Sequence, residues 1–172
     1  MSRLWLARHA EARPDEMGLT EAGRRQAALL GERLAGAGIK RISHSPLPRA
    51  VETASIVSAA LPGVPVVAAG ELTDSDPTDD PAAAEAMVAR FADPPADELC
   101  ITHMFQIGWF VRAVLDAPAA RWAALNSANT GVTVLRWSSN PGVPVSPLVF
   151  NDLTHLPAEL RWTGFPPELQ VP

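Results

Sequence analysis

The feature that most constrains this chain is a regular alternation between short apolar runs and longer segments with helical periodicity. Apolar runs at residues 4–7, 39–43, 64–68 and 99–102 have the length of buried strands. Between them, apolar residues recur three or four positions apart, which is typical of the inner face of a helix. This alternation predicts an α/β fold, a three-layer α/β/α sandwich with a mainly parallel sheet.

Two further strands are expected towards the C-terminus, at residues 130–137 and 145–150, paired as a hairpin across the segment Ser-Ser-Asn-Pro-Gly. They bring the expected sheet to about six strands, one of them antiparallel. The proline-rich tail from Pro157 is expected to lie over the surface.

Local signals predict where helices begin. Thr20 is a good N-cap for the first helix, and a pair of glycines follows its last apolar residue. Pro46 and Pro48 mark the start of a second helix, because proline is tolerated only in a first turn. An acidic loop at residues 71–81 precedes a third helix at residues 82–91.

Length and composition narrow the class of protein. The 172 residues are expected to form a single domain over residues 1–172. A net charge of −5 lacks the basic surplus that nucleic-acid binders carry, so no nucleic-acid partner is expected. Cys100 is the one cysteine, which excludes an intrachain disulfide and indicates a reducing compartment. Because no apolar run has the length of a signal peptide or a membrane span, we expect a cytoplasmic protein without a membrane partner.

Charged and polar residues gather where the expected strands end. The first strand runs into Arg8 and His9, the second into His44 and Ser45, and the fourth into His103. The carboxyl ends of parallel strands meet at one edge of the sheet, where ligands of open α/β folds bind. These side chains are therefore expected to lie close together.

Arg49 adds a hint about the ligand. It lies in the first turn of the second helix, where a cation opposes the positive end of the helix dipole unless an anion is bound. A helix N-terminus beside an arginine suits a phosphate or a carboxylate. Two arginines, two histidines and a nearby carboxylate form a set suited to phosphoryl transfer, with a histidine as nucleophile and a carboxylic acid as proton donor.

The segments "LARHAEA", "GLTEAGRRQAALLGERL", "SHSPLPRAVETASIV" and "ITHMFQIGWFVRAVL" together resemble the histidine phosphatase superfamily, which has the phosphoglycerate mutase-like fold. The resemblance covers nearly the whole chain. It implies that His9 is the nucleophile that becomes phosphohistidine, with Arg8, Arg49 and His103 completing the phosphate pocket. It also implies that no metal or other cofactor is needed.

The resemblance selects Asp74 as the general acid, with Glu71 and Asp76 as competitors, since the family more often has a glutamate. Ser45 either donates a hydrogen bond near the phosphate or caps the following helix. His44 is read as a polar residue that flanks the pocket, and Glu11 receives no step in the reaction.

Two departures refine the expected activity. Ala10 replaces the glycine that more often follows the nucleophile, and only about ten residues separate His9 from the LTEAG segment. The segment between Asp74 and Glu98 is short as well. These short segments favour the compact phosphatase branch, with a phosphorylated small molecule or a phosphoprotein as substrate. A phosphoglycerate-type mutase, a non-catalytic phosphate-binding domain and a histidine-ligated metallohydrolase remain the alternatives. The sequence does not indicate the oligomeric state.

Overall fold

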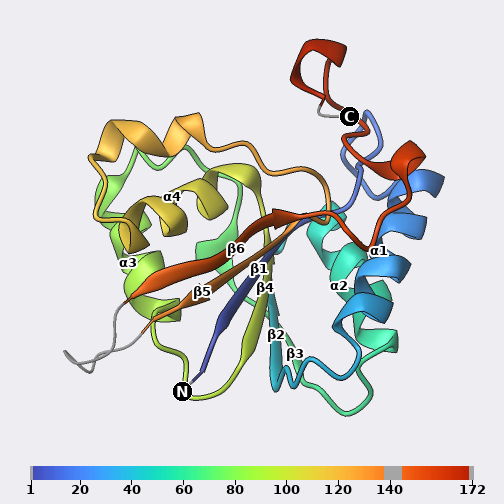
Figure 1. The fold of residues 1–172 in the computed structure, drawn as a ribbon, viewed down its shortest axis with the longest axis horizontal. Coiled ribbons are helices and arrows are strands. Elements are labelled where there is room, and N and C mark those ends of the chain that lie inside the picture. Colours follow the sequence, from blue (N-terminus) through green and yellow to red (C-terminus); the bar gives the residue numbers. More distant parts are fainter. Residues whose placement is uncertain (1, 138–144, 171–172) are drawn as a thin grey trace.

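The structure, a computed structural model, describes residues 2–137 and 145–170. Its middle layer is a six-stranded sheet in the order β3-β2-β4-β1-β5-β6 (Figure 1). The strands are β1 (Leu4–Arg8), β2 (Arg41–His44), β3 (Val66–Ala68), β4 (Glu98–Thr102), β5 (Val132–Arg136) and β6 (Ser146–Asp152). The α-helices are α1 (Glu21–Leu34), α2 (Pro48–Ala59), α3 (Pro81–Phe91) and α4 (Met104–Val114). Short 3₁₀ helices are η1 (Gly70–Leu72), η2 (Ala119–Ala124), η3 (Ala158–Leu160) and η4 (Pro167–Leu169).

The strand directions confirm the predicted mixed sheet. β1 pairs in parallel with β4, so that Leu4 lies opposite Glu98 and Arg8 opposite Thr102. β2 is parallel to both β3 and β4. β5 is antiparallel to β1 and to β6, and among the described strands it alone runs against the others. The turn of the predicted hairpin, Ser-Ser-Asn-Pro-Gly, lies outside the described residues.

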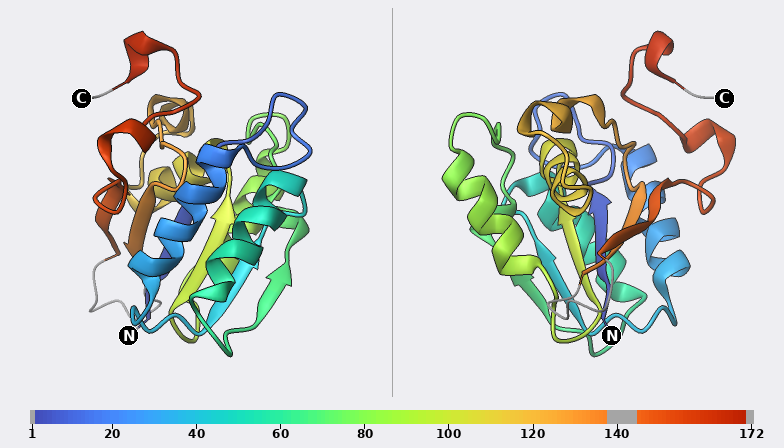
Figure 2. Two further views of the ribbon diagram at one scale, coloured as in Figure 1. Left: turned by 90° about the vertical axis from the view of Figure 1, so that its right-hand side faces the viewer. Right: turned by 60° about the vertical axis from the view of Figure 1, so that its left-hand side comes forward.

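Helices cover both faces of the sheet, with α1 and α2 on one side and α3 and α4 on the other (Figure 2). The side chains of β1 alternate between the two layers. Leu4 and Leu6 pack into the cluster with α3 and α4, whereas Trp5 and Ala7 pack into the cluster with α1 and α2. A strand that is buried on both faces has to be apolar at every position, which explains the continuous run at the start of the chain.

Several boundaries differ from the predicted ones. β1 continues to Arg8, and β2 is shifted towards His44, so the last paired residue of each strand has a polar side chain. The second helix begins at Pro48 rather than at Pro46, with Pro48 in the first turn and Leu47 as an N-cap that makes no side-chain bond. Thr20 is the predicted N-cap of α1, and its Oγ1 accepts from Gly23 N at 2.9 Å.

The C-terminal segment from Pro157 lies largely over the surface, as predicted, and it also makes contacts with α1. Leu160 is buried, and the Gln26 amide of α1 donates to Leu160 O at 2.9 Å and to Thr163 Oγ1 at 2.7 Å. Figures 1 and 2 show this segment beyond the carboxyl end of the sheet, next to α1. Its backbone is therefore part of the edge that was expected to bind a ligand.

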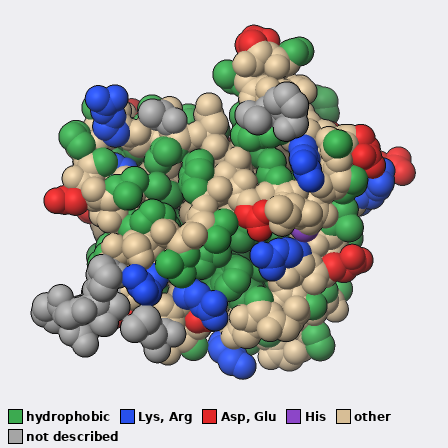
Figure 3. Space-filling view, viewed as in Figure 1, with side chains coloured by type: hydrophobic (Ala, Val, Ile, Leu, Met, Phe, Trp, Pro, Cys, Tyr) green, Lys and Arg blue, Asp and Glu red, His purple; other side chains and the backbone are tan. Residues whose placement is uncertain are grey.

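β6 forms one edge of the sheet and remains partly open to solvent. Leu148, Val149 and Phe150 are 40–47% exposed. The space-filling view shows apolar surface over β5 and β6 on this side of the molecule (Figure 3).

Gly23 provides a test of how tightly α1 packs against the loop that follows His9. A Cβ at Gly23 would overlap the carbonyl oxygen of Glu11. Glycine to alanine in a helix usually stabilises by up to about 1 kcal/mol. Here we expect Gly23→Ala to lower the free energy of unfolding by about 1–3 kcal/mol, because backbone cannot move aside as a side chain does.

Urea unfolding of Gly23→Ala and Gly31→Ala measures this difference. At Gly31 the nearest atom is the Ala60 Cβ at 3.1 Å, so a smaller loss is expected there. A Gly23→Ala protein as stable as the wild type would contradict this account of the packing.

Candidate active site

A groove of about 280 Å³ lies at the carboxyl edge of the sheet. Arg8 and His9 reach it from the end of β1, Arg49 from the first turn of α2, and Asp74 from the loop after η1. The groove is lined by Arg8, His9, Glu11, Ala12, Arg13, Pro14, Glu16, Arg49, Asp74, Asn129 and Gly164. His103, directly after β4, lies against this set with its ring centroid 5.0 Å from that of His9.

The Arg49 guanidinium lies at the centre of the contacts. Its side chain is 6% exposed, and its Nε donates to His9 Nε2 at 3.2 Å. Its Nη2 donates to Asp74 Oδ2 at 2.7 Å, and its Nη1 donates to Glu16 Oε2 at 3.0 Å. One buried cation thus contacts the predicted nucleophile, the predicted acid and a further carboxylate.

The hydrogen bonds of His9 indicate which ring nitrogen is available for attack. Nδ1 lies 2.8 Å from the carbonyl oxygen of Ala10 and donates to it, so Nε2 carries the lone pair that faces Arg49. Burial lowers the pKa of His9 well below its ordinary value, and the charges of Arg8 and Arg49 and the contact with His103 lower it further. His9 is therefore neutral at physiological pH, as a nucleophile has to be.

His103 is also held neutral. Burial, followed by the charges of Arg49 and Arg8, lowers its pKa to about 3. Its Nε2 is hydrogen-bonded to Ser45 Oγ at 2.8 Å, and its Nδ1 lies 3.6 Å from Asp74 Oδ2 and 3.4 Å from Arg49 Nη2. Ser45, which also accepts from Leu47 N at 3.3 Å, therefore links the start of α2 to His103.

Arg8 has a different environment from Arg49. Its Nη1 donates to Ser127 O at 2.8 Å, and its guanidinium lies 5.0 Å from the centre of the Phe165 ring. Burial lowers the pKa of Arg8 to about 10, so it stays charged at neutral pH. Within the described residues, its Nε is buried without a hydrogen-bond partner, which leaves a donor for an anion beside His9.

The three candidate acids lie in different places. Asp74 is 37% exposed and contacts Arg49 and His103, as described above. Glu71 and Asp76 line a separate hollow of about 260 Å³ between η1 and α3. Asp76 accepts from Thr78 N at 2.8 Å and from Thr78 Oγ1 at 2.6 Å, and these bonds lower its pKa. The geometry therefore favours Asp74 over both competitors.

Two residues with open roles can be placed. Thr20 Oγ1 donates to Glu11 Oε1 at 2.8 Å, and Glu11 N donates to Gln26 Oε1 at 2.9 Å, so Glu11 fastens the loop after His9 to α1. His44 is buried at the end of β2 with its Nδ1 2.8 Å from Ser45 O. Its ring lies outside the set of described residues that line the groove, in agreement with a flanking position.

Sequence reasoning missed three contributors to the site. Asn129 Nδ2 donates to His9 O at 2.9 Å, Phe165 covers Arg8, and Glu16 contacts Arg49. Asn129 and Phe165 lie more than a hundred positions from the residues they touch, and no local pattern marks them. Glu16 lay within reach of sequence reasoning, since it is a carboxylate in the short loop directly after the nucleophile.

Ala10, the departure from the usual glycine, fits its position. It is fully buried, and its N–H donates to Thr53 Oγ1 at 3.0 Å. It packs with Leu19 and Ala27, so the methyl group fills space between the loop and α1.

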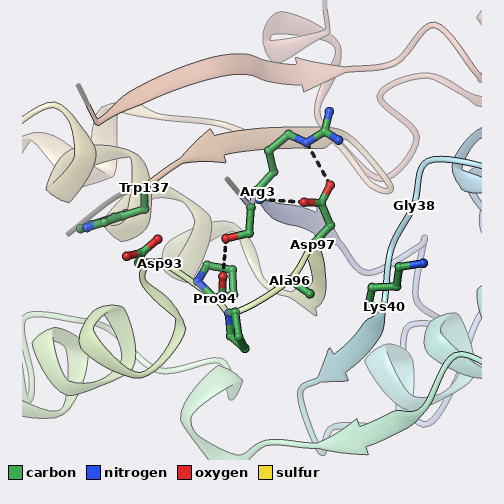
Figure 4. Close-up of a pocket in the computed structure, with 10 residues that line it drawn as sticks. Arg3, Gly38, Lys40, Asp93, Pro94, Ala96, Asp97 and Trp137 are labelled. Atoms are coloured by element: carbon green, nitrogen blue, oxygen red, sulfur yellow. Dashed lines mark hydrogen bonds and ion pairs between the residues drawn. The ribbon is translucent and has the colours of Figure 1, made fainter. Parts of the chain in front are cut away.

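A larger hollow of about 550 Å³ lies at the opposite end of the sheet, near the residues where β1, β2 and β4 begin (Figure 4). Arg3 and Asp97 pair there at 2.9 Å, and Asp97 also accepts from Trp5 Nε1 at 3.2 Å. Arg3 and Asp97 therefore satisfy one another, and the catalytic candidates of the chain gather at the smaller groove. In the described part of the chain, no three His, Cys, Asp or Glu side chains are grouped so as to hold a metal ion.

The neutral histidines make stability depend on pH. His103 and His155, with pKa values of about 3 and about 4, titrate near 6.5 when unfolded. Between these limits the unfolded state binds more protons, so stability falls as the pH drops below about 6.5. Each histidine lowers the free energy of unfolding by up to about 1.4 kcal/mol for each pH unit of this decrease. We expect His103→Gln to lose less stability than the wild type between pH 6.5 and pH 4, as measured by urea unfolding.

His155→Gln serves as the comparison, because His155 Nε2 contacts Thr130 Oγ1 at 3.2 Å away from Arg49. Inorganic phosphate should also reduce the loss at low pH, since a bound anion favours the protonated His103. If the free energy of unfolding falls equally with pH in the wild type and in His103→Gln, His103 is not held neutral in the folded protein.

Comparison with known proteins adds a family to this geometry. The model of the histidine phosphatase superfamily (branch 1) matches residues 4–80. The serine/threonine-protein phosphatase PGAM5, mitochondrial, of Mus musculus is 32% identical over 163 residues, which span 77% of this chain and 57% of that protein. Its counterpart in Xenopus laevis is 30% identical over 186 residues, spanning 91% of this chain and 67% of that protein. The chain thus spans little more than half the length of the mouse protein.

The fold is also found among solved structures. That of Bacillus stearothermophilus YhfR superposes with a TM-score of 0.71 at 23% identity, covering 90% of this chain and 99% of that one. The solved structure supports the phosphoglycerate mutase-like fold, and the sequence matches extend from the first strand to the loop that carries Asp74 and beyond. The chain belongs to the histidine phosphatase superfamily.

Proposed function

We propose that this protein is a metal-independent phosphatase that hydrolyses phosphate monoesters through a phosphohistidine intermediate on His9. The observation that carries the proposal is the position of Arg49, which faces His9 Nε2 with Nε and Asp74 with Nη2. A phosphoryl group bound to Arg49 in place of the carboxylates has the nucleophile on one side and the acid on the other. The buried Nε of Arg8 supplies a second donor.

In the first step, Nε2 of His9 attacks phosphorus as the bond to the ester oxygen breaks. Asp74 in its acid form gives its proton to the leaving oxygen. Asp74 is paired with Arg49 in the free protein, and displacement by the substrate puts it beside negative charge, which favours the acid form. The bound phosphate favours protonation of His103, which then balances the charge on the phosphoryl oxygens together with Arg8 and Arg49.

In the second step, water attacks phosphorus and the bond to His9 breaks. The Asp74 carboxylate takes the proton from the water, so the acid of the first step is the base of the second. Inorganic phosphate leaves, and His9 returns to the neutral form that its surroundings favour.

The open groove favours hydrolysis over the alternatives. Glu16 is 68% exposed and Asp74 is 37% exposed, so water has access to a bound intermediate that a mutase would have to retain. The charges of Arg8 and Arg49 would repel a metal ion in the same groove. A purely phosphate-binding domain would have no use for the neutral Nε2 of His9.

Two classes of substrate are considered. A phosphorylated small molecule and a phosphoprotein both fit an open groove, and the similarity to proteins named serine/threonine-protein phosphatases favours a phosphoprotein. Those relatives are named as mitochondrial, so the cytoplasmic location inferred from the sequence stays a prediction. No helix within residues 2–137 and 145–170 is long and apolar enough to cross a membrane.

The nucleophile is tested by hydrolysis of an aryl phosphate in the presence of EDTA. The wild type is expected to remain active, and His9→Ala is expected to lose at least about a thousandfold in kcat. His155→Gln, a histidine outside the groove, serves as the control. Loss of wild-type activity on chelation would contradict the metal-independent reaction, and equal activity of His9→Ala would contradict the nucleophile.

The acid is tested by varying the leaving group. Asp74→Asn is expected to slow hydrolysis of an alkyl phosphate by about a hundredfold or more, and to slow an aryl phosphate much less, because an aryl oxide leaves without a proton. Glu71→Gln and Asp76→Asn, which change the carboxylates of the neighbouring hollow, are the matched controls. A selective defect in either control and not in Asp74→Asn would move the acid to that residue.

A further inference from the structure

Glu16 is a charged residue of the groove for which the proposed reaction has no use. Its carboxylate contacts Arg49 Nη1 at 3.0 Å from the solvent side, and its side chain is 68% exposed. It therefore lies at the mouth of the groove, where the rest of a substrate has to pass.

The backbone fixes Glu16 in this position. Glu16 N donates to Arg13 O at 2.9 Å, and Arg13 N donates to Gly18 O at 2.9 Å, so residues 13–18 form a closed turn. Ala12 and Leu19 pair across the base of this turn. The backbone of Glu16 thus stays beside the groove when the contact with Arg49 is lost, and its carboxylate stays within reach of the groove mouth.

Binding of a phosphate ester leaves Glu16 without its cation. The dianionic phosphate takes the Arg49 guanidinium, which is the only positive group with a described contact to Glu16 within the part of the chain that the structure covers. The neighbouring Arg13 is already paired with Asp15 at 2.5 Å. A carboxylate then lies unpaired beside the phosphate, and its repulsion is relieved if the substrate itself carries a positive charge.

We propose that Glu16 is a specificity-determining residue that selects phosphate monoesters with a positive charge next to the phosphate. The inference rests on the proposed phosphatase activity. The chemistry is shared by a phosphoserine followed by Lys or Arg and by a small ester such as 2-aminoethyl phosphate. In both, an ammonium or guanidinium group replaces Arg49 as the partner of Glu16.

The test measures kcat/KM for three phosphoserine peptides that differ only in one neighbouring residue, which is Arg, Gln or Glu. It also compares 2-aminoethyl phosphate with ethyl phosphate. In the wild type we expect the Arg peptide to exceed the Gln peptide by about twofold to fivefold, the range of a partly exposed ion pair. The preference should shrink as salt is raised.

Glu16→Gln should abolish the preference, and Glu16→Lys should reverse it. Glu32→Gln removes the same charge from an exposed position of α1 and should keep the wild-type preference. A preference among the peptides assigns the selection to protein substrates, and one confined to 2-aminoethyl phosphate assigns it to small molecules.

An equal preference in the wild type and in Glu16→Gln would overturn the inference while the phosphatase activity stands. An equal loss on every substrate in Glu16→Gln would overturn it as well, because Glu16 would then hold the loop rather than select the substrate. A wild type inactive on all esters, aryl phosphate included, would instead overturn the proposed function itself.

Discussion

The buried guanidinium of Arg49 is the interaction on which the site depends. It brings together groups from separate segments: His9 after β1, Glu16 in the next loop, Asp74 after η1 and His103 after β4. A cation buried to this degree has to be paired, because its desolvation is otherwise too costly. Two carboxylates supply that pairing in the free protein, and the phosphate of a substrate supplies it in the proposed complex.

The same cation determines the state of the histidines. Its charge and that of Arg8 act together with burial to hold His9 and His103 neutral. For His9 this keeps a lone pair on Nε2 at physiological pH. At neutral pH, His103 is expected to take up a proton when an anion binds beside it. Binding of the phosphate and protonation of His103 are therefore coupled.

The platform for these groups is a sheet whose central strands are buried on both faces. β1 and β4 lie side by side and end at Arg8 and Thr102, one residue before the two histidines. Rigid neighbouring strands hold His9 and His103 at a set separation. The outer parts of the groove come from loops and from the C-terminal segment, where Phe165 covers Arg8.

Much of this arrangement follows from the sequence, because it depends on local patterns. The strand–helix alternation predicted the layers, and the strand ends predicted Arg8, His9, Arg49 and His103 as neighbours. The boundaries of β2 and α2 were displaced by a few residues, since pairing with β3 and β4 and the first-turn proline decide them. The sequence could not establish which of Asp74, Glu71 and Asp76 is the acid, because all three lie in one acidic loop. The path of that loop in the structure places Asp74 against Arg49 and the other two in the neighbouring hollow.

By itself, the sequence determined the family, the order of the elements and the residues able to carry the chemistry, since these depend on periodicity and on short motifs. The tertiary structure alone decided what lies around them. It joined Asn129 to His9, Phe165 to Arg8 and Gln26 to the C-terminal segment. These contacts link residues more than a hundred positions apart, and their energies exist only once the chain has folded.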